Sequence, residues 1–557
     1  MIVKNLKNWL DSGAPYIWLN AGAVSVSILM VLGLLTLIAV RGLGHFWPKP
    51  IAEFDYTDAQ GASTIVIGEL VEHESVPRAR VSETDVRIPE GMDFIDRYLV
   101  KTGNRDQFGL DFRWVVGTAM SDIRYPEELM AVERREWGNM YAYLLAVKQD
   151  GEVVATDTIS VLDRFRQVIA ETADIHDAIE HIEKDLIGEI NFNMEKLRLQ
   201  SRQMEQTQSG EPAGQGLTVE KQNELQQQYD SHAEELARLY AELGKYSITA
   251  RLSDGTEVEV PLSQVVRVYY PNSMSLFDKT GFYLMKLWEF VSDEPREANT
   301  EGGIFPAIFG TVMMVIIMSI MVTPFGVIAA VYLREYAKQG PFVRIIRIAV
   351  NNLAGVPSVV YGVFGLGFFV YFVGGNIDQW FFAELLPSPT FGTPGLLWAS
   401  LTLAILTVPV VIVSTEEGLS RVPRSIREGS LALGATKAET LLRTVLPMTA
   451  SAMMTGLILA IARAAGEVAP LMLVGVVKLS PSLPLDANAP YLHLERKFMH
   501  LGFHIYDVGF QSPNVEAARP LVFATALLLV LIIIFLNLAA IHIRNKLREQ
   551  YLASEQH

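Results

Sequence analysis

Long apolar runs alternate with charged segments along this chain. Crossing a bilayer as a helix takes about 20 mostly apolar residues. Runs of that size lie at residues 16–40, 304–333, 348–373, 394–415, 448–477 and 519–541. The first is too long for a removable signal sequence and lacks its small-residue cleavage site, so we expect a retained anchor. The pattern therefore predicts an all-α polytopic membrane domain with six transmembrane helices.

Basic residues flank the predicted spans on alternate sides. Short basic loops stay in the cytoplasm, and Lys4 and Lys7 precede the first span, which places the N-terminus inside. Further clusters follow the second, fourth and sixth spans: Arg334, Lys338, Arg344 and Arg347; Arg421, Arg424, Arg427, Lys437 and Arg443; Arg544, Lys546 and Arg548. We therefore expect cytoplasmic residues before the first span within 1–40, a cytoplasmic tail at 546–557, and an extracytoplasmic region at 41–303.

The region 41–303 has the pattern of a soluble α+β domain. Asp-Gly pairs at 150–151 and 254–255 lie between alternating apolar residues, which is typical of β-hairpins with type I′ turns. Between them, residues 164–246 show helical periodicity with a polar break at 206–216. We expect an antiparallel helical hairpin of coiled-coil character, whose apolar seam either packs on itself or binds a partner.

Charge and composition exclude some functions for this region. It holds 47 acidic and 27 basic residues, and the whole chain has a net charge of −16 and no cysteine. Such acidity does not attract an anion, so an anionic substrate would need another protein to deliver it. His176 and His181 are five residues apart, not the four of a two-histidine metal site on a helix. We expect no metal site and no catalytic constellation.

The fifth apolar run, residues 448–477, carries two opposite charges. Arg463 and Glu467 are four residues apart and would share one helical face. A charge at mid-membrane depth costs about 2.5 to 3.5 kcal/mol on insertion scales, so it needs a reason. Either the two form an internal ion pair, or they line a translocation path in which the Arg463 fork binds an oxyanion. We expect Pro470 to open the helix one turn later.

Small residues in two of the spans indicate bends and close packing. Gly355, Pro357, Ser358 and Gly362 would bend the third span, freeing backbone groups to line a polar cavity or serving packing alone. In the fifth span, glycines would permit close approach of a neighbouring helix; these are Gly456, Gly466 and Gly475.

The segment 414–456 predicts a helix, a glycine turn and a second helix on the basic face. Pro423 suits a helix start, and Gly434 suits the left-handed position that ends one. Thr436 with Glu439 completes a capping box for the next helix. Pro447 marks where we expect that helix to stop or kink.

The run EGSLALGATKAETLLRTVLP in this segment resembles the EAA loop of ABC-importer permeases, at about 416–447 here. Glu428, Gly434, Leu446 and Pro447 fall at the matching positions. Gly429 and Ser430 replace the two alanines of that pattern, and Thr444 stands where isoleucine is usual. The resemblance implies that these four matching residues couple the chain to a separate ATPase, in whose cleft such a loop sits.

Two further runs resemble the phosphate-importer permeases PstA and PstC. They are NNLAGVPSVVYGVFGLGFF in the third span and ILAIARAAGEVAPLMLVG in the fifth, and GEVAP favours PstA. The resemblance covers about residues 300–545, with a permease domain at 304–545, and does not extend to 41–303. It implies a substrate path through Arg463 and Glu467, with Ser358 as a further candidate.

The resemblance also implies partners. They are a PstC-like second permease, a PstB-like ATPase carrying ATP and Mg²⁺, a PstS-like phosphate-binding protein outside, and the lipid of a bacterial cytoplasmic membrane. The chain has no phosphate-binding loop of its own, since the Gly-Lys at 244–245 is followed by Tyr246. We expect a transporter subunit that is not an enzyme, binds no cofactor and has no nucleic-acid partner.

Two alternatives stay open. Within transporters, the substrate could be another oxyanion such as sulfate or molybdate. In a different class, the chain could be a membrane-anchored sensor or scaffold that acts through its extracytoplasmic helical hairpin, although such a sensor would need a cytoplasmic signalling domain.

Overall fold

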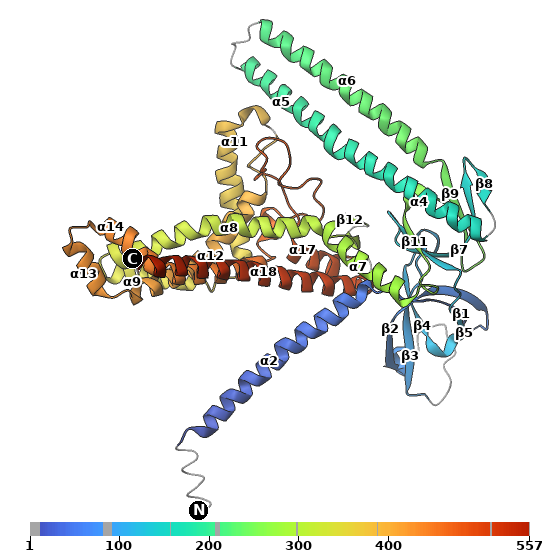
Figure 1. Cartoon of the computed structure of the whole chain (residues 1–557), viewed down its shortest axis with the longest axis horizontal. Coiled ribbons are helices and arrows are strands. Elements are labelled where there is room, and N and C mark those ends of the chain that lie inside the picture. The colour runs from blue at the N-terminus through green and yellow to red at the C-terminus, as the bar shows by residue number, and fades with distance from the viewer. Residues whose placement is uncertain are drawn as a thin grey trace, which may run out of the picture.

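The computed structural model describes residues 12–58, 60–81, 92–155, 158–206, 212–296, 299–386, 388–512 and 515–555. A helical bundle occupies one end of the molecule and a soluble domain with two sheets occupies the other (Figure 1). Among the described residues, six helices are long and apolar enough to cross a membrane, which confirms the polytopic prediction. They are Pro15–Phe46, Phe305–Tyr336, Ser358–Phe381, Leu396–Arg421, Lys437–Ala465 and Ala518–Lys546.

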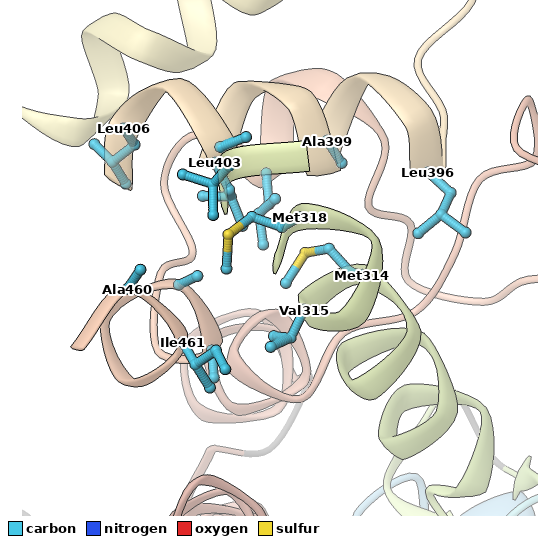
Figure 2. Packing of buried hydrophobic residues seen from close by; sticks show 14 of the residues in the cluster. Met314, Val315, Met318, Leu396, Ala399, Leu403, Leu406, Ala460 and Ile461 are labelled. Atoms are coloured by element: carbon cyan, nitrogen blue, oxygen red, sulfur yellow. The ribbon is translucent and has the colours of Figure 1, made fainter. Parts of the chain in front are cut away.

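The centre of the bundle is α12 (Leu396–Arg421), which packs between α8 (Phe305–Val331) and α15 (Leu446–Ala465). Met314 and Met318 of α8 meet Leu403 of α12 and Ala460 of α15 (Figure 2). The helices approach closely because small residues lie at the crossings. A Cβ on Gly326 would lie 2.5 Å from Val411 Cγ1, and one on Gly456 would lie 2.7 Å from Ser414 Cβ.

The first span, α2 (Ala14–Leu43), diverges from the bundle (Figure 1). None of its most apolar 18-residue window is buried inside the molecule. Its contact with α18 (Val515–Glu555) includes Gly42, where a Cβ would lie 2.8 Å from the Ala524 nitrogen, and Arg41, which lies over the Phe523 ring. An apolar helix without cover in the chain is covered in a membrane by lipid or by another subunit.

The third span differs from the predicted run at 348–373. Residues up to Leu353 belong to a separate amphipathic helix, α9 (Pro341–Leu353). Proline disfavours helical conformation in the residue before it, and Pro357 accordingly separates α9 from the span. The span comprises α10 (Ser358–Phe364), a π-helical segment η8 (Gly365–Gly374) and α11 (Gly375–Phe381).

The fifth span also differs from its prediction. Helical backbone runs through Pro447 without stopping, because a π-helical segment, η10 (Leu441–Val445), precedes it and leaves Pro447 in the first turn of α15. The span then ends at Ala465 and does not reach 477. The short α16 (Leu471–Val474) and α17 (Leu501–Tyr506) follow before the π-helical η11 (Asp507–Gln511) and α18.

The soluble domain contains two large antiparallel sheets and a two-stranded antiparallel one, β12 (Pro295–Arg296) with β13 (Glu301–Gly302). The first has the order β4-β3-β2-β1-β5 and the second β10-β9-β7-β6-β11, with β8 paired to β7. Tyr141 joins them, because its hydroxyl donates to Glu69 Oε1 at 2.8 Å. The strands are β1 Ile51–Thr57, β2 Ser63–Pro77, β3 Phe94–Lys101, β4 Phe112–Val116, β5 Met120–Arg124, β6 Leu129–Arg134, β7 Met140–Gln149, β8 Glu152–Ala155, β9 Tyr246–Arg251, β10 Glu257–Pro261 and β11 Val265–Tyr269.

Both Asp-Gly pairs form hairpins, but with different turns. Asp150 (φ 50°) and Gly151 (φ 82°) are both left-handed, as a type I′ turn requires. At the second pair only Gly255 has positive φ, 83°, and its N–H bonds to the Leu252 carbonyl across a longer loop. The type I′ prediction is therefore wrong at Asp254, where a longer connection relaxes the requirement for two left-handed residues.

The helical hairpin starts at Thr158, six residues before the expected range 164–246, ends at Leu243 and projects away from the sheets (Figure 1). One arm is α4 (Thr158–Glu180), a π-helical segment η4 (His181–Leu186) and α5 (Ile187–Gln206), and the other is α6 (Pro212–Leu243). Tyr240 donates to Glu183 across the arms at 2.8 Å. Part of the expected break, from Pro212 to residue 216, is helical, and residues 207–211 lie outside the described residues.

The helix α7 (Leu276–Ser292) connects the second sheet to the bundle and starts with a Ser275/Asp278 capping box. Its Glu289 is buried among three cations, at 2.6 Å from Arg296, 3.0 Å from Lys286 and 3.1 Å from Arg267. Burial alone would raise the pKa of Glu289, but the positive charges outweigh it and lower that pKa from 4.5 to about 2.

Candidate functional site

Arg463 and Glu467 lie at the end of a helix and not on the face of a continuous one. Arg463 is in the last turn of α15, Gly466 caps that helix, and Glu467 lies beyond it. Their side chains still meet, with Arg463 Nε 3.6 Å from Glu467 Oε1, and both are partly exposed at 30% and 21%. The expected pairing is present, and the expected shared helical face is wrong because the helix ends between the two residues.

The end of α15 gives Arg463 a favourable electrostatic environment. The last carbonyl groups of a helix lack intrahelical partners and carry partial negative charge, which favours a cation in the last turn. Proline also keeps the chain from continuing as helix, and Pro470, five residues after α15 ends, is the N-cap of the short α16. Pro470 therefore lies after an existing break, and the prediction that it opens the fifth span is wrong.

The third span meets this break directly. A Cβ on Gly362 of α10 would lie 2.7 Å from Pro470 Cα and 3.0 Å from the Pro470 oxygen, so only glycine fits. The neighbouring Tyr361 donates its hydroxyl to the Leu353 carbonyl at 2.6 Å. The structure thus brings together two motifs about 100 residues apart in the sequence.

Ser358 is the first residue of α10 and is partly buried. It lies one helical turn before Gly362, which places it near the break but not in a described contact with either charge.

The three glycines that were expected to permit close packing in the fifth span differ in their surroundings. A Cβ added to Gly475 would lie 2.7 Å from the Gly395 oxygen, and one added to Gly456 would lie 2.7 Å from Ser414 Cβ, so both positions are closely packed. A Cβ added to Gly466 would meet only the Arg463 oxygen, at 4.0 Å, so Gly466 supports no close packing.

The helix-turn-helix at the opposite end of the bundle forms as predicted. α13 (Arg424–Ala432) follows Pro423, and Gly434 has φ 89°, which only glycine adopts readily. Thr436 and Glu439 complete a capping box at α14 (Lys437–Thr440). Glu428 and Gly434 are exposed.

Leu446 and Pro447 occupy a different environment from Glu428 and Gly434. They lie in the first turn of α15, and Leu446 packs against a cluster of buried residues, Leu419, Val422, Leu441 and Val445. The four residues expected to couple the chain to an ATPase therefore form an exposed pair in the loop and a partly buried pair at its root.

Glu335, which the sequence reasoning did not single out, anchors this loop through two of its basic residues. Arg427 donates to the carbonyls of Leu419 and Val422, both at 2.7 Å, and to Glu335 Oε1 at 2.9 Å. Lys437 donates to the Glu335 carbonyl and lies over Tyr336. Arg427 and Lys437 were already counted as basic residues that indicate membrane orientation, but no pattern in the sequence reveals that they converge on Glu335.

Comparison with known proteins decides the family. Residues 322–549 match the family described as binding-protein-dependent transport system inner membrane component. The phosphate transport system permease protein PstA 1 of Mycobacterium tuberculosis is 33% identical over 244 residues, 44% of this chain and 71% of that protein. PstA of Yersinia pestis is 31% identical over 257 residues, 46% and 77% respectively. The chain belongs to the PstA-type ABC permeases.

The shared region of this PstA-type permease is its membrane part. PstA of Mycobacterium leprae is 36% identical over 206 residues, 36% of this chain and 62% of that protein, so the chain spans less than two thirds of this relative. Among solved structures, the inward-facing MetNI methionine ABC transporter covers 43% of this chain at 17% identity with a TM-score of 0.33, a likeness too low to decide the fold.

A cavity in the described part of this PstA-type permease lies away from Arg463. It measures about 860 Å³ and lies between the soluble domain and the ends of α2 and α18. Residues lining it include Arg41, Lys49, Lys101, Lys286, Glu301 and Arg519. No group of three or more residues able to hold a metal ion occurs among the residues that the structure describes; His176, for example, contacts the Ser263 carbonyl at 2.9 Å.

Proposed function

We propose that this chain is the PstA-type membrane subunit of an ATP-driven phosphate importer. It would form the substrate path with a second, PstC-like permease. The observation that carries this proposal is the 31–36% identity to phosphate transport permeases named PstA. The arginine beside a helix break supports it, because an oxyanion path needs a hydrogen-bond donor of positive charge inside the membrane part.

In this proposal Arg463 is the substrate ligand. Its planar guanidinium can donate two parallel hydrogen bonds to two oxygens of a phosphate, which an ammonium cannot do. Glu467, 3.6 Å away, would limit how tightly the arginine holds the anion and could accept a hydrogen bond from a protonated phosphate hydroxyl. Ser358 would line the path from α10.

The break after α15 has a role of its own in this proposal. Irregular backbone is tolerated at membrane depth where it is buried in protein or lines a water-filled cavity. Residues 466–470 leave the helix beside Arg463 and contact α10 at Gly362. We therefore assign this segment to the wall of the path.

ATP hydrolysis would occur on a separate, PstB-like chain with its own ATP and Mg²⁺. Glu428 and Gly434 are exposed. The α13–α14 segment to which they belong lies at the end of the bundle remote from the soluble domain (Figure 1), where a partner can reach it. Arg427, Lys437 and Glu335 fix the loop to the second span, so a force on the loop would be transmitted to the bundle.

The charge pattern supports an orientation with the soluble domain outside the cytoplasm and both termini inside. A PstS-like binding protein would then deliver phosphate on the soluble-domain side. Delivery by a protein fits the acidic character of that domain, which repels free anions at short range.

The deciding experiment is purification of the tagged chain with its subunits, followed by reconstitution into liposomes. We expect an ATPase and a second permease to co-purify, and ATP hydrolysis to rise with phosphate-loaded binding protein. Sulfate and molybdate, each tested separately in place of phosphate, should give no stimulation of ATP hydrolysis. Stimulation by one of these anions in place of phosphate would contradict the substrate, and a chain that repeatedly purifies alone would contradict the subunit role.

A further inference from the structure

The helix α7 carries an exposed apolar stripe. Phe277, Leu284, Trp288 and Val291 are 91%, 60%, 73% and 38% exposed. Their spacing of seven, four and three residues places them on one face of the helix. We call these four residues the α7 stripe. So large a contiguous apolar face on a short helix is unusual unless something covers it.

The opposite face of α7 is fixed to the soluble domain. Phe282, Glu289 and Phe290 are buried, and Phe282 packs on Tyr269 of β11 with ring centroids 4.5 Å apart. Glu289 and Lys286 take part in the ion-pair network with the second sheet. The stripe therefore cannot turn inward without breaking that network, so its exposure is a property of the fold.

The position of α7 relative to the spans indicates what covers the stripe. Phe46, the last residue of the first span, packs on Phe290 with centroids 4.9 Å apart, and Trp47 packs on Tyr283 at 5.8 Å. The second span begins at Phe305, soon after α7 ends. The helix therefore lies at the level where the spans leave the membrane, between the bundle and the sheets (Figure 1).

Two arginines lie at the same end of the bundle as α7. Arg41 in the last turn of α2 and Arg519 near the start of α18 both line the cavity that Phe282 and Lys286 line from α7. Arginine near the ends of spans places its charge among lipid headgroups, and tryptophan is enriched in the same zone. Trp288 lies on the stripe, on the side of α7 away from that cavity.

We propose that α7 lies in the plane of the membrane surface at the soluble-domain end of the bundle, with the α7 stripe buried in phospholipid. An apolar face on one side and charged residues on the other is the pattern of helices that bind at this interface. The soluble domain, with 47 acidic and 27 basic residues within 41–303, could not be held there by attraction to anionic lipid. The contact fixes the orientation of the domain above the bundle, and it holds whichever substrate the bundle carries.

The absence of cysteine makes the test direct. Single replacements Leu284→Cys and Trp288→Cys carry a nitroxide spin label in the full chain, reconstituted with its co-purified subunits in liposomes of phosphatidylethanolamine and phosphatidylglycerol. Val153→Cys is the matched control, because Val153 is an apolar residue that is 52% exposed on β8, within the second sheet. Oxygen concentrates in lipid, whereas a nickel chelate stays in water, so their collision rates report burial.

We expect labels at 284 and 288 to collide with oxygen several-fold more often than with the nickel chelate, and the label at 153 to show the reverse. Nickel collisions at 284 and 288 equal to those at 153 would place the stripe in water and overturn the proposal. Shielding from both reagents would also overturn it, since it would show that a protein covers the stripe. A further label at Phe277 distinguishes a stripe that is buried along its length from one buried only at Trp288.

Discussion

The end of α15 gives Arg463 a structural reason to be present as well as a functional one. A cation in the last helical turn is stabilised by about 0.3 to 1 kcal/mol through the helix dipole, and Glu467 offsets part of the cost of burying its charge. Both effects require only a positive charge, which lysine would supply equally well. Only the binding of an oxyanion requires the two-donor geometry of arginine, and this difference separates the two roles.

Replacement of Arg463 by lysine tests that difference. Lysine keeps the charge, the helix-terminal position and the pairing with Glu467, but it cannot form the two parallel hydrogen bonds. If Arg463 binds phosphate, we expect uptake to fall at least about tenfold, which is the effect of losing roughly 1.4 kcal/mol of binding. Radiolabelled phosphate uptake at equal membrane levels of each protein is the measurement.

The paired change Arg463→Leu with Glu467→Met completes this test. An ion pair kept for structure can be replaced by apolar residues at little cost, so both variants should insert normally. Near-normal uptake by the apolar double variant, or by the lysine variant, would show that the two charges only neutralise each other and do not bind substrate.

Gly362 is the residue that fits α10 against Pro470. Gly362→Ala would place a Cβ 2.7 Å from Pro470 Cα, where backbone must move, and we expect a loss of roughly 1 to 3 kcal/mol in stability from overpacking. Gly367→Ala is the control in the same span, with nothing within 4 Å of the added atom. Thermal unfolding in detergent measures both. Equal melting temperatures for the two variants would contradict the contact.

At the scale of elements, the α13–α14 loop combines local caps with distant anchors. The turn depends on the left-handed Gly434 and the Thr436 box, and the position of the loop depends on Arg427 and Glu335. Gly434→Val would strain the turn by roughly 1 to 3 kcal/mol, and Glu428→Lys reverses an exposed charge. We expect both to leave the protein in the membrane but to abolish substrate-stimulated ATP hydrolysis.

Gly429→Ala is the control for the loop. Gly429 is helical and has nothing within 4 Å of an added Cβ, so alanine should stabilise α13 by up to about 1 kcal/mol and keep coupling. Wild-type stimulation of ATP hydrolysis in the Gly434 and Glu428 variants would refute the coupling role of this loop.

The attachment of α7 to the sheets depends on pH through Glu289. Its pKa is lowered from 4.5 to about 2, so its stabilising effect, roughly 3 kcal/mol, is complete above pH 4.5 and is lost as the pH falls toward 2. Glu289→Gln should therefore lower the melting temperature at pH 7, and the difference from the wild type should shrink below pH 4. Glu257→Gln, at an exposed position on β10, should change neither. A difference that is the same at pH 7 and pH 3 would contradict the ion-pair account.

At the scale of the whole molecule, only part of the helical hairpin can be removed without disturbing the second sheet. Phe165 and Val168 of α4 are buried in the core of the second sheet, and Ile179 and Leu243 are also buried. Removing residues 164–246 as a unit would therefore expose that core. The distal part of α5 and α6 extends beyond the sheets (Figure 1).

Replacing residues 192–231 by a short glycine-rich linker should leave the sheets folded and ATPase association unchanged, since the hairpin is remote from the α13–α14 loop. Co-purification of the ATPase and a melting temperature within a few degrees of wild type are the measurements. Loss of the ATPase would contradict this separation. Uptake driven by the binding protein should fall only if the hairpin guides that protein, and unchanged uptake would mean that its seam serves packing alone.

The sequence by itself determined the features that depend on neighbours within a few residues. Apolar runs of about 20 residues predicted six spans, and caps and turn glycines predicted the loop at Gly434 and the hairpin at Gly151, because each signal is complete within one or two helical turns. The resemblance of the motifs pointed to the family. The two charges at 463 and 467 were recognised as unusual for the same local reason.

Only the tertiary structure decided where packing overrides those local sequence signals. The fifth span ends at Ala465 and Pro470 packs on Gly362; the third span starts at Ser358; helix continues through Pro447. Glu289 meets Arg267, and Arg427 meets Glu335, across 22 and 92 residues. Such contacts depend on the folded path of the chain and leave no periodic signal in it. The same holds for the α7 stripe, which has the local pattern of a buried helix face and is exposed because the ion-paired opposite face already occupies the protein side.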